Sequence, residues 1–193
     1  MAKTISENGV NLIKKYEGYR LTAYKCVSTE QYYTIGWGHY GKDVMKGQTI
    51  SQAQADQLLL LDLQKYVGYV NNKEYCPVTD NLNQNQFDAL VSFTYNCGAG
   101  NLKALCKNRS ISAIGNALPL YNKSGGKILA GLTKRRNEEK ELFFSTENKT
   151  TYAEEKAAAA AWVKSMGISD GSNPTKAITR EQMWVMLYRA LHK

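Results

Sequence analysis

Apolar residues recur at helical spacing in several separate segments of this 193-residue chain. The first segment covers residues 6–17 and is followed by Gly18, a residue that commonly ends helices. It places Glu17 on the same helical face as Val10 and Ile13. The pattern therefore predicts a short amphipathic helix with a carboxyl group at the end of its apolar face.

The pattern changes to alternation between Leu21 and Tyr40, where aromatic and β-branched residues dominate. This change predicts a small antiparallel sheet or hairpin that turns near residues 27–31. Segment 32–40 alternates bulky side chains on one face with glycines around Thr34 on the other. Glycines inside a strand often mark the close approach of a ligand or of another backbone, the alternative being relief of sheet twist or a bulge.

Helical periodicity returns after the sheet and continues to about residue 145. The predicted helices cover residues 51–70, 83–100, 110–121 and 131–144, with a glycine-containing loop at 122–127. One helix, a small sheet and then a helical body predict an α+β domain over residues 1–145.

A smaller module follows the polar linker 146–151. Residues 152–193 comprise an Ala-rich helical segment, a loop with DG and NP turn signals, and a second helix that opens with a capping box at Thr179. Two short helices bury little apolar surface. We therefore expect this all-α module to dock on the first domain or to pair with another copy of the chain.

Charge and hydropathy narrow the class of protein. A net charge of +8, from 25 basic and 17 acidic residues, suits a polyanionic partner such as nucleic acid, an acidic membrane surface or a bacterial wall carrying teichoic acids. No segment reaches the roughly 18 apolar residues of a membrane span, and the start lacks the apolar core of a signal peptide. We therefore expect that the protein is synthesised in a cytoplasm and does not insert into a membrane. No basic patch interleaved with aromatic residues supports nucleic-acid binding.

The cysteines and histidines do not predict a metal site. Four cysteines without a CxxC pair and two histidines do not give conventional zinc spacing. We expect no metal or cofactor, and free thiols in a reducing compartment.

Glu17 is the first candidate for chemistry. A carboxyl group on the apolar face of a helix loses solvation, which disfavours its ionised form. That property suits a general acid that passes a proton to a leaving oxygen. The alternative is an ordinary helix-end residue paired with Lys14 or Arg20.

A family resemblance gives Glu17 a context. Glu17, then Cys26 after eight residues, then a threonine ahead of IGWGH resemble the glutamate, aspartate-or-cysteine, threonine constellation of phage-type lysozymes. These proteins form glycoside hydrolase family 24 and are usually endolysins. The likeness continues through LNQNQFDALVSFTYNCGAG and GGKILAGLTKRRNEEKELF and covers about residues 5–145.

The resemblance implies a muramidase that hydrolyses the β-1,4 bond between N-acetylmuramic acid and N-acetylglucosamine in peptidoglycan. Glu17 would be the general acid. Thr34, together with Cys26, would position the attacking water of an inverting mechanism. His39 would order the site, and Tyr32 would stack on sugar rings.

The basic segment 134–136 would lie near the cleft by the same resemblance. Arg135 or Arg136 would then support substrate or pair with Glu17, whereas the alternative is a solvated helix face.

Two departures from the family pattern affect the residues expected to position the attacking water. Cys26 replaces the second carboxylate of the usual pair, a variant that the family tolerates. Seven residues instead of five separate Cys26 from Thr34, which brings Glu30 into the turn. Glu30 would serve there as the missing carboxylate, or it is a solvated turn residue.

The C-terminal module resembles a single S-layer-homology motif, with ITREQ followed by a Met-Leu pair. Such modules anchor proteins to wall polysaccharide in Gram-positive bacteria, usually as three motifs together. By this likeness Arg180 would contact an anionic secondary wall polymer, and Trp184 or Trp162 would stack on its chain. The alternative is a helix-capping arginine and a core tryptophan.

The sequence thus predicts an endolysin-like muramidase that stays in the host bacterial cytoplasm until it is released to the wall. One rival is a lytic transglycosylase that cleaves the same bond. The other is a non-catalytic wall-binding protein that keeps the lysozyme fold.

Overall fold

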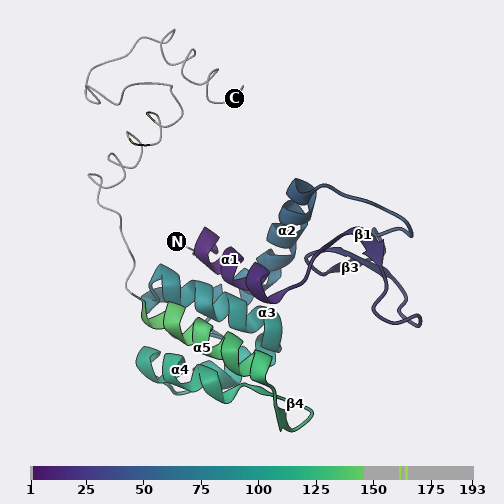
Figure 1. The fold of residues 1–193 in the computed structure, drawn as a ribbon. Helices are drawn as coiled ribbons and strands as arrows, with labels where there is room; N and C mark the ends of the chain where they lie inside the picture. The colour runs from purple at the N-terminus through teal and green to yellow at the C-terminus, as the bar shows by residue number, and fades with distance from the viewer. Residues whose placement is uncertain (1, 146–160, 162–163, 165–193) are drawn as a thin grey trace. The chain divides into compact units, whose positions relative to one another are not determined.

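The computed structural model describes residues 2–145, 161 and 164. The chain divides into two units, Met1–Glu147 and Asn148–Lys193. The account below concerns the first unit, coloured from purple to green in Figure 1. The linker predicted at 146–151, and the module at 152–193 apart from residues 161 and 164, lie outside the described residues.

The first unit has the predicted α+β architecture, with a small sheet beside a helical body. Its elements are α1 (Glu7–Tyr16), β1 (Arg20–Tyr24), β2 (Tyr33–Gly36), β3 (His39–Gly41), α2 (Gln52–Asn71), α3 (Gln84–Cys106), α4 (Ile111–Ala117), β4 (Lys123–Ser124), β5 (Lys127–Ile128) and α5 (Ala130–Phe144). Short 3₁₀ turns cover Thr79–Asn81 and Leu118–Leu120.

Helix α3 is the centre of the helical body. It packs against α1, α2 and α5, and Figure 1 shows α3 and α5 running side by side. The side chains of Ile13, Leu63, Phe87 and Phe143 are fully buried in this core. The sheet lies beside the start of α2, away from α4 and α5 (Figure 1).

Side-chain caps define where two of the long helices begin. Ser51 and Asn83 each form a capping box with the glutamine three residues later, which satisfies backbone N–H groups at the start of α2 and α3. The prediction for α2 is confirmed to within one residue. Helix α3 does not stop at its glycines as predicted; Gly98 adopts φ 81° and ψ 166°, which makes a kink, and the helix continues to Cys106.

The sheet is antiparallel in the order β1-β2-β3. The expectation of one alternating strand over 32–40 is wrong, because Gly36 (φ 62°) and Gly38 (φ 104°) turn the chain between β2 and β3. A Cβ on Gly36 would lie 3.3 Å from the Cβ of Ala55 in α2. This glycine therefore permits the close packing of a helix and does not clear space for a ligand.

Helix α1 is fixed at both ends by contacts outside the helix. Its N-cap residue, Ser6, donates its backbone N–H and its hydroxyl to the buried carboxylate of Asp88 in α3. At the other end Glu17 is the C-cap, in an extended conformation with φ −100° and ψ 125°. The helix ends directly before Gly18, as predicted, although Gly18 itself does not have the positive φ of a typical glycine stop.

Two glycines in helix interiors provide a matched test of this packing. A Cβ on Gly115 in α4 would come within 2.6 Å of Phe143 and 2.7 Å of Phe144, whereas a Cβ on Gly68 in α2 would meet nothing within 4 Å. We expect Gly115→Ala to lower the free energy of unfolding by about 1–3 kcal/mol through overpacking. Gly68→Ala should raise it by about 0.5–1 kcal/mol through helix propensity.

Urea unfolding of the full chain, followed by far-ultraviolet circular dichroism, measures both changes. Equal effects of the two substitutions would contradict the packing of α4 against α5.

Candidate active site

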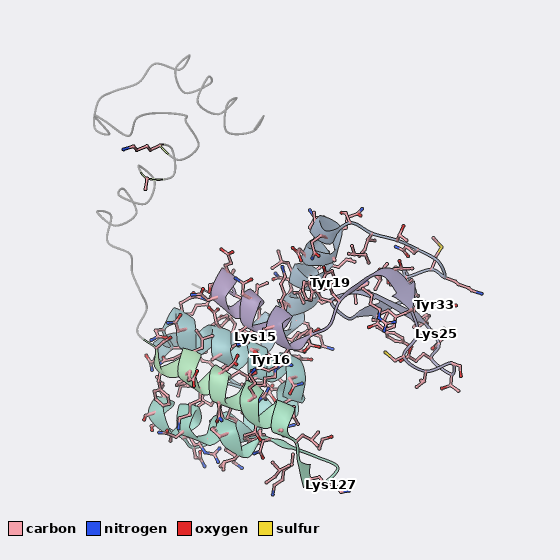
Figure 2. All side chains as sticks on the ribbon, viewed as in Figure 1. Lys15, Tyr16, Tyr19, Lys25, Tyr33 and Lys127 are labelled. Atoms are coloured by element: carbon pink, nitrogen blue, oxygen red, sulfur yellow. The ribbon has the colours of Figure 1, made fainter. Side chains whose placement is uncertain are left out.

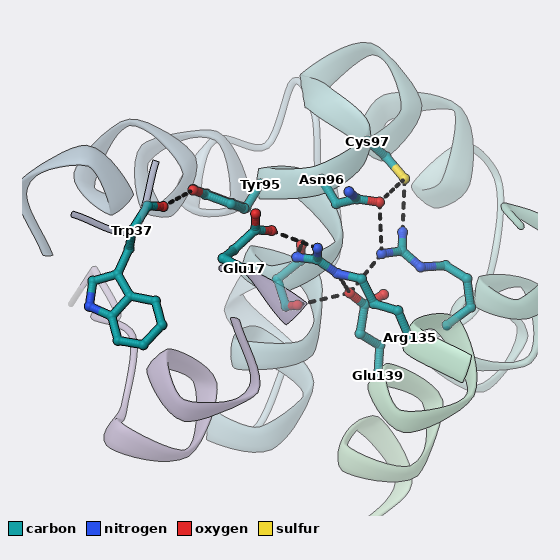
Figure 3. Close-up of polar contacts among 9 residues, drawn as sticks. Glu17, Trp37, Tyr95, Asn96, Cys97, Arg135 and Glu139 are labelled. Atoms are coloured by element: carbon teal, nitrogen blue, oxygen red, sulfur yellow. Dashed lines mark hydrogen bonds and ion pairs between the residues drawn. The ribbon is translucent and has the colours of Figure 1, made fainter. Parts of the chain in front are cut away.

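Glu17 lies where α1 ends and the chain turns toward β1. Its Oε1 accepts a hydrogen bond from Nη1 of Arg135 in α5, at 2.8 Å (Figure 3). The side chain of Glu17 is 27% exposed and that of Arg135 is 4% exposed. The ion pair thus joins a solvent-accessible carboxylate to a buried guanidinium.

Lys14 and Arg20, the two partners considered for Glu17, are engaged elsewhere. Lys14 Nζ forms an ion pair with Asp56 Oδ1 at 2.8 Å. The Arg20 guanidinium lies 4.5 Å from the centre of the Tyr24 ring. The actual partner of Glu17 is 118 residues away in sequence, and the sequence predicted it only as one of two arginines.

The guanidinium of Arg135 is held on several sides. Its Nε donates to Glu139 Oε1 at 3.2 Å, and its Nη2 donates to the carbonyl oxygen of Ser92 at 3.5 Å. It also lies 5.4 Å from the centre of the Tyr16 ring, a cation–π contact. These contacts fix the direction from which Arg135 reaches Glu17.

Arg136 points away from Glu17 and is fully buried. Its Nη2 donates to Glu139 Oε1 at 2.8 Å and to Asn96 Oδ1 at 3.1 Å, and its Nη1 donates to Cys97 Sγ at 2.8 Å (Figure 3). A fully buried side chain has no surface for a sugar. The expectation that Arg136 contacts substrate is therefore corrected to a role inside the domain.

Glu139 is the carboxylate between the two arginines. Its Oε1 accepts from both of them and from the hydroxyl of Ser92, the latter at 2.8 Å. Burial raises the pKa of Glu139, and the charges of Arg135 and Arg136 oppose this rise. Of the basic segment 134–136, only Lys134 is exposed.

Tyr95 connects the region of Glu17 to the sheet. Its hydroxyl donates to the carbonyl oxygen of Trp37, in the turn between β2 and β3, at 3.3 Å (Figure 3). Burial raises the pKa of Tyr95, and the negative charge of Glu17 raises it further. The indole of Trp37 donates to Asp56 at 2.7 Å and stacks on Tyr19 with 4.5 Å between ring centres.

Cys26, Glu30 and Lys25 meet in the turn between β1 and β2. The backbone N–H of Cys26 donates to Glu30 Oε2 at 2.8 Å, and Lys25 Nζ donates to the carbonyl oxygen of Glu30 at 2.6 Å. Lys25 Nζ also lies 5.0 Å from the centre of the Tyr33 ring, and Figure 2 shows the labelled pair at the sheet. Glu30 is thus a residue that closes the turn, with its Oε2 already occupied, and the Cys26 side chain is exposed.

Thr34 is buried in β2 and pairs with Tyr24 across the ladder. Within residues 2–145, no hydrogen bond joins Thr34, Cys26 or Glu30 to Glu17.

His39 is held at both ring nitrogens. Nδ1 lies 3.0 Å from both carboxylate oxygens of Asp62 in α2, and Nε2 lies 2.9 Å from Asp43. Burial lowers the pKa of His39, but hydrogen bonds to the two carboxylates outweigh burial, so the pKa is raised overall. With both nitrogens engaged, His39 joins β3 to α2 and orders the sheet.

Tyr32 and Tyr40 form an aromatic pair at the edge of the sheet. Their ring centres are 5.6 Å apart in an edge-on arrangement, and the N–H of Tyr32 donates to the Tyr40 hydroxyl at 3.2 Å. Tyr40 is 48% exposed and offers the larger surface to a ligand.

The described part of the chain contains neither a cluster of His, Cys, Asp or Glu suited to a metal ion nor a helix long and apolar enough to span a membrane. Arg180 and Trp184, the candidates for wall binding, lie outside the described residues.

Ser92, Tyr95 and Glu139 were not predicted from the sequence. Two signals were available. Ser92 interrupts an apolar run within a helix, and Arg135 and Glu139 have the (i, i+4) spacing of a helical ion pair.

The chain is similar to proteins of a known family. Residues 14–139 match the family model described as "Phage lysozyme". The endolysin of Salmonella phage P22 is 37% identical over 150 residues, which cover 73% of this chain and 98% of that protein. The muramidase domain of SpmX from Asticaccaulis excentricus superposes with a TM-score of 0.62 at 34% identity, covering 74% of this chain and 99% of that one.

The endolysin of Bacillus phage B103 is 47% identical over 155 residues, which cover 78% of this chain. The match spans only 57% of that relative's length.

The two carboxylates around His39 predict a pH-dependent contribution to stability. Because the pKa of His39 is raised in the folded state, its contribution is fully present below about pH 6.5 and is lost as the pH rises through the raised value. We expect His39→Asn to lower the free energy of unfolding by up to about 1 kcal/mol at pH 6, and by less at pH 9.

Urea unfolding at the two pH values measures this difference, with His192→Asn, at the chain's other histidine, as the control. A loss that grows with pH would contradict the ion pairs of His39.

Proposed function

Because the chain belongs to the phage lysozyme family, we propose that it is an endolysin that hydrolyses bacterial peptidoglycan. The bond cleaved is the β-1,4 linkage between N-acetylmuramic acid and N-acetylglucosamine, in a Gram-positive wall. The observation that carries this proposal is the accessible Glu17 carboxylate held by the buried Arg135. The names of the relatives, endolysin and muramidase domain, support it.

Glu17 is the general acid in this proposal. The contact with Arg135 uses Oε1, so Oε2 is the oxygen that carries the proton toward the glycosidic oxygen. As the proton leaves, negative charge develops on the carboxylate. The fixed guanidinium stabilises this charge without having to reorient.

We assign the positioning and activation of the attacking water to residues of the sheet and its turns. An inverting mechanism needs a base on the face of the sugar opposite the acid. A neutral thiol is a poor base, so we assign this role to the Glu30 carboxylate, whose Oε2 is fixed by the Cys26 N–H. Thr34 assists in orienting the water, Tyr32 and Tyr40 provide surface for sugar rings, and no metal or cofactor takes part.

The C-terminal module would bind an anionic secondary polymer of the wall through Arg180 and Trp184. Its resemblance to an S-layer-homology motif supports this assignment, and pairing of modules from two chains would strengthen weak binding. The protein would remain in the host cytoplasm until lysis releases it to the wall.

Replacement of Glu17 is the direct test. Glu17→Gln keeps the shape of the side chain and removes the proton, so we expect the rate of clearing of a Gram-positive peptidoglycan suspension to fall by about 100-fold or more. Glu7→Gln, at an exposed carboxylate at the other end of α1, should clear at the rate of the wild type.

Equal clearing by wild type and Glu17→Gln would remove Glu17 from the mechanism. Failure of the wild type to clear the suspension, while it still sediments with the wall, would favour a non-catalytic binding protein. Mass analysis of the fragments separates hydrolysis from transglycosylation, because the anhydro product of a transglycosylase lacks one water.

Two substitutions separate the candidates for the base. If Glu30 activates the water, Glu30→Gln should lower the clearing rate by about 100-fold or more, while Cys26→Ser retains most of the activity. The reverse order of activities, measured in the same turbidity assay, would assign the role to Cys26.

A further inference from the structure

The second buried arginine, Arg136, has no carboxylate of its own. Arg135 pairs with Glu17 and with Glu139, and Arg136 shares Glu139 while its other partners, Asn96 and Cys97, are neutral acceptors. Arg136 and Glu139 are fully buried, so water screens their charges poorly.

The charges of the four ionisable groups sum to zero only when Glu17 is ionised. When Glu17 is ionised, two cations, Arg135 and Arg136, face two carboxylates, Glu17 and Glu139. When Glu17 holds its proton, the cluster carries one excess positive charge, which favours release of that proton. Without Glu139 the excess would be larger in both states, and the protonated acid would be harder to maintain.

We propose that Glu139 is a positioning residue for the reaction, which holds Arg135 against Glu17 and offsets the charge of Arg136, so that Glu17 faces the net charge of one arginine instead of two. This inference rests on the proposed function of Glu17 as the general acid. Glu139 acts only through Arg135, since it is fully buried and has no surface to offer to substrate.

Hydrogen bonds from two helices hold Glu139 in place. Glu139 Oε1 receives three donors, from Ser92 in α3 and from the two arginines in α5, at 2.8 to 3.2 Å. Ser92 also accepts from Arg135 through its carbonyl oxygen. One serine therefore fixes both members of the Arg135–Glu139 pair to the central helix.

The other titratable groups near the cluster come from three elements. They are Tyr16 on α1, Tyr95 and Cys97 on α3, and Glu138 on α5. Burial raises the pKa values of Tyr16, Tyr95 and Cys97, so these three groups remain neutral near pH 7. Glu138 is paired with Lys15 at 2.7 Å, which lowers its pKa and keeps it ionised. None of the four changes charge where Glu17 works.

Two substitutions of opposite sign test the charge balance. Glu139→Gln removes a negative charge, so the ionised form of Glu17 is favoured, and we expect the alkaline limb of the pH–rate profile for peptidoglycan clearing to move down by about one pH unit. Arg136→Met removes a positive charge, and we expect the same limb to move up by a similar amount.

If Glu139 had only a structural role, the two substitutions would change the rate or the stability. They would not move the alkaline limb of the pH–rate profile in opposite directions. Glu141→Gln, at an exposed carboxylate on α5, should leave the profile unchanged. Glu139→Asp keeps the charge and should keep the limb in place even where its shorter side chain lowers the rate. Each variant is checked for folding by circular dichroism, and either charge-removing variant alone gives the sign of the shift.

The outcomes separate this inference from the proposed function. If wild type clears peptidoglycan, Glu17→Gln does not, and neither charge-removing variant moves the limb as stated, the role of Glu139 is overturned while the general acid stands. If Glu17→Gln clears like wild type, the proposed function fails, and this inference fails with it.

Discussion

The burial of two arginines against a single carboxylate is the interaction on which this domain depends. Taking charged groups out of water costs several kcal/mol for each ion, and this cost is offset only where geometry and hydrogen bonds are good. Arg135, Arg136 and Glu139 meet that condition with help from Ser92 and Asn96. Removing one member of such a cluster would cost about 3–5 kcal/mol, because it leaves an uncompensated charge in the helical body.

The same cluster connects the core to the surface. Arg135 touches both the buried Glu139 and the partly exposed Glu17, so the position of the acid is set by the packing of α3 and α5. The sheet is attached separately, through the His39–Asp62 pair, the Trp37–Asp56 hydrogen bond and the Tyr95 hydroxyl. The proposed acid and the residues proposed to hold water are therefore attached to the helical body by separate sets of contacts.

The sequence carried enough information for the architecture, and it singled out Glu17, whose proposed role as the acid stays a prediction. Helical periodicity and capping residues located α2 and α5 well, because those signals are local. Local signals failed at Gly98, where burial of Leu102 and Leu105 beyond the kink outweighs the tendency of glycine to end a helix. They failed again around Gly36, whose positive φ makes a turn where alternation alone predicts a continuous strand.

The candidate site was less predictable because its contacts join distant segments. Neither Lys14 nor Arg20, the near neighbours of Glu17, is its partner, and the choice between Arg135 and Arg136 depends on which side of α5 faces α1. Periodicity around a charged helix does not reveal this, since both arginines of α5 are buried. Only the packed structure shows that one arginine faces the acid and the other faces the core.

The anchoring of α1 at its two ends has a consequence for synthesis on the ribosome. A ten-residue helix is marginal by itself in water. Its start is held by Asp88, 82 residues further along the chain, and the acid at its end is held by Arg135, 118 residues further along. The segment that carries Glu17 thus emerges before either of the two residues that hold it. A nascent chain that ends before α5 has the glutamate but lacks the partner that orients it, so the site is assembled only when the domain is whole.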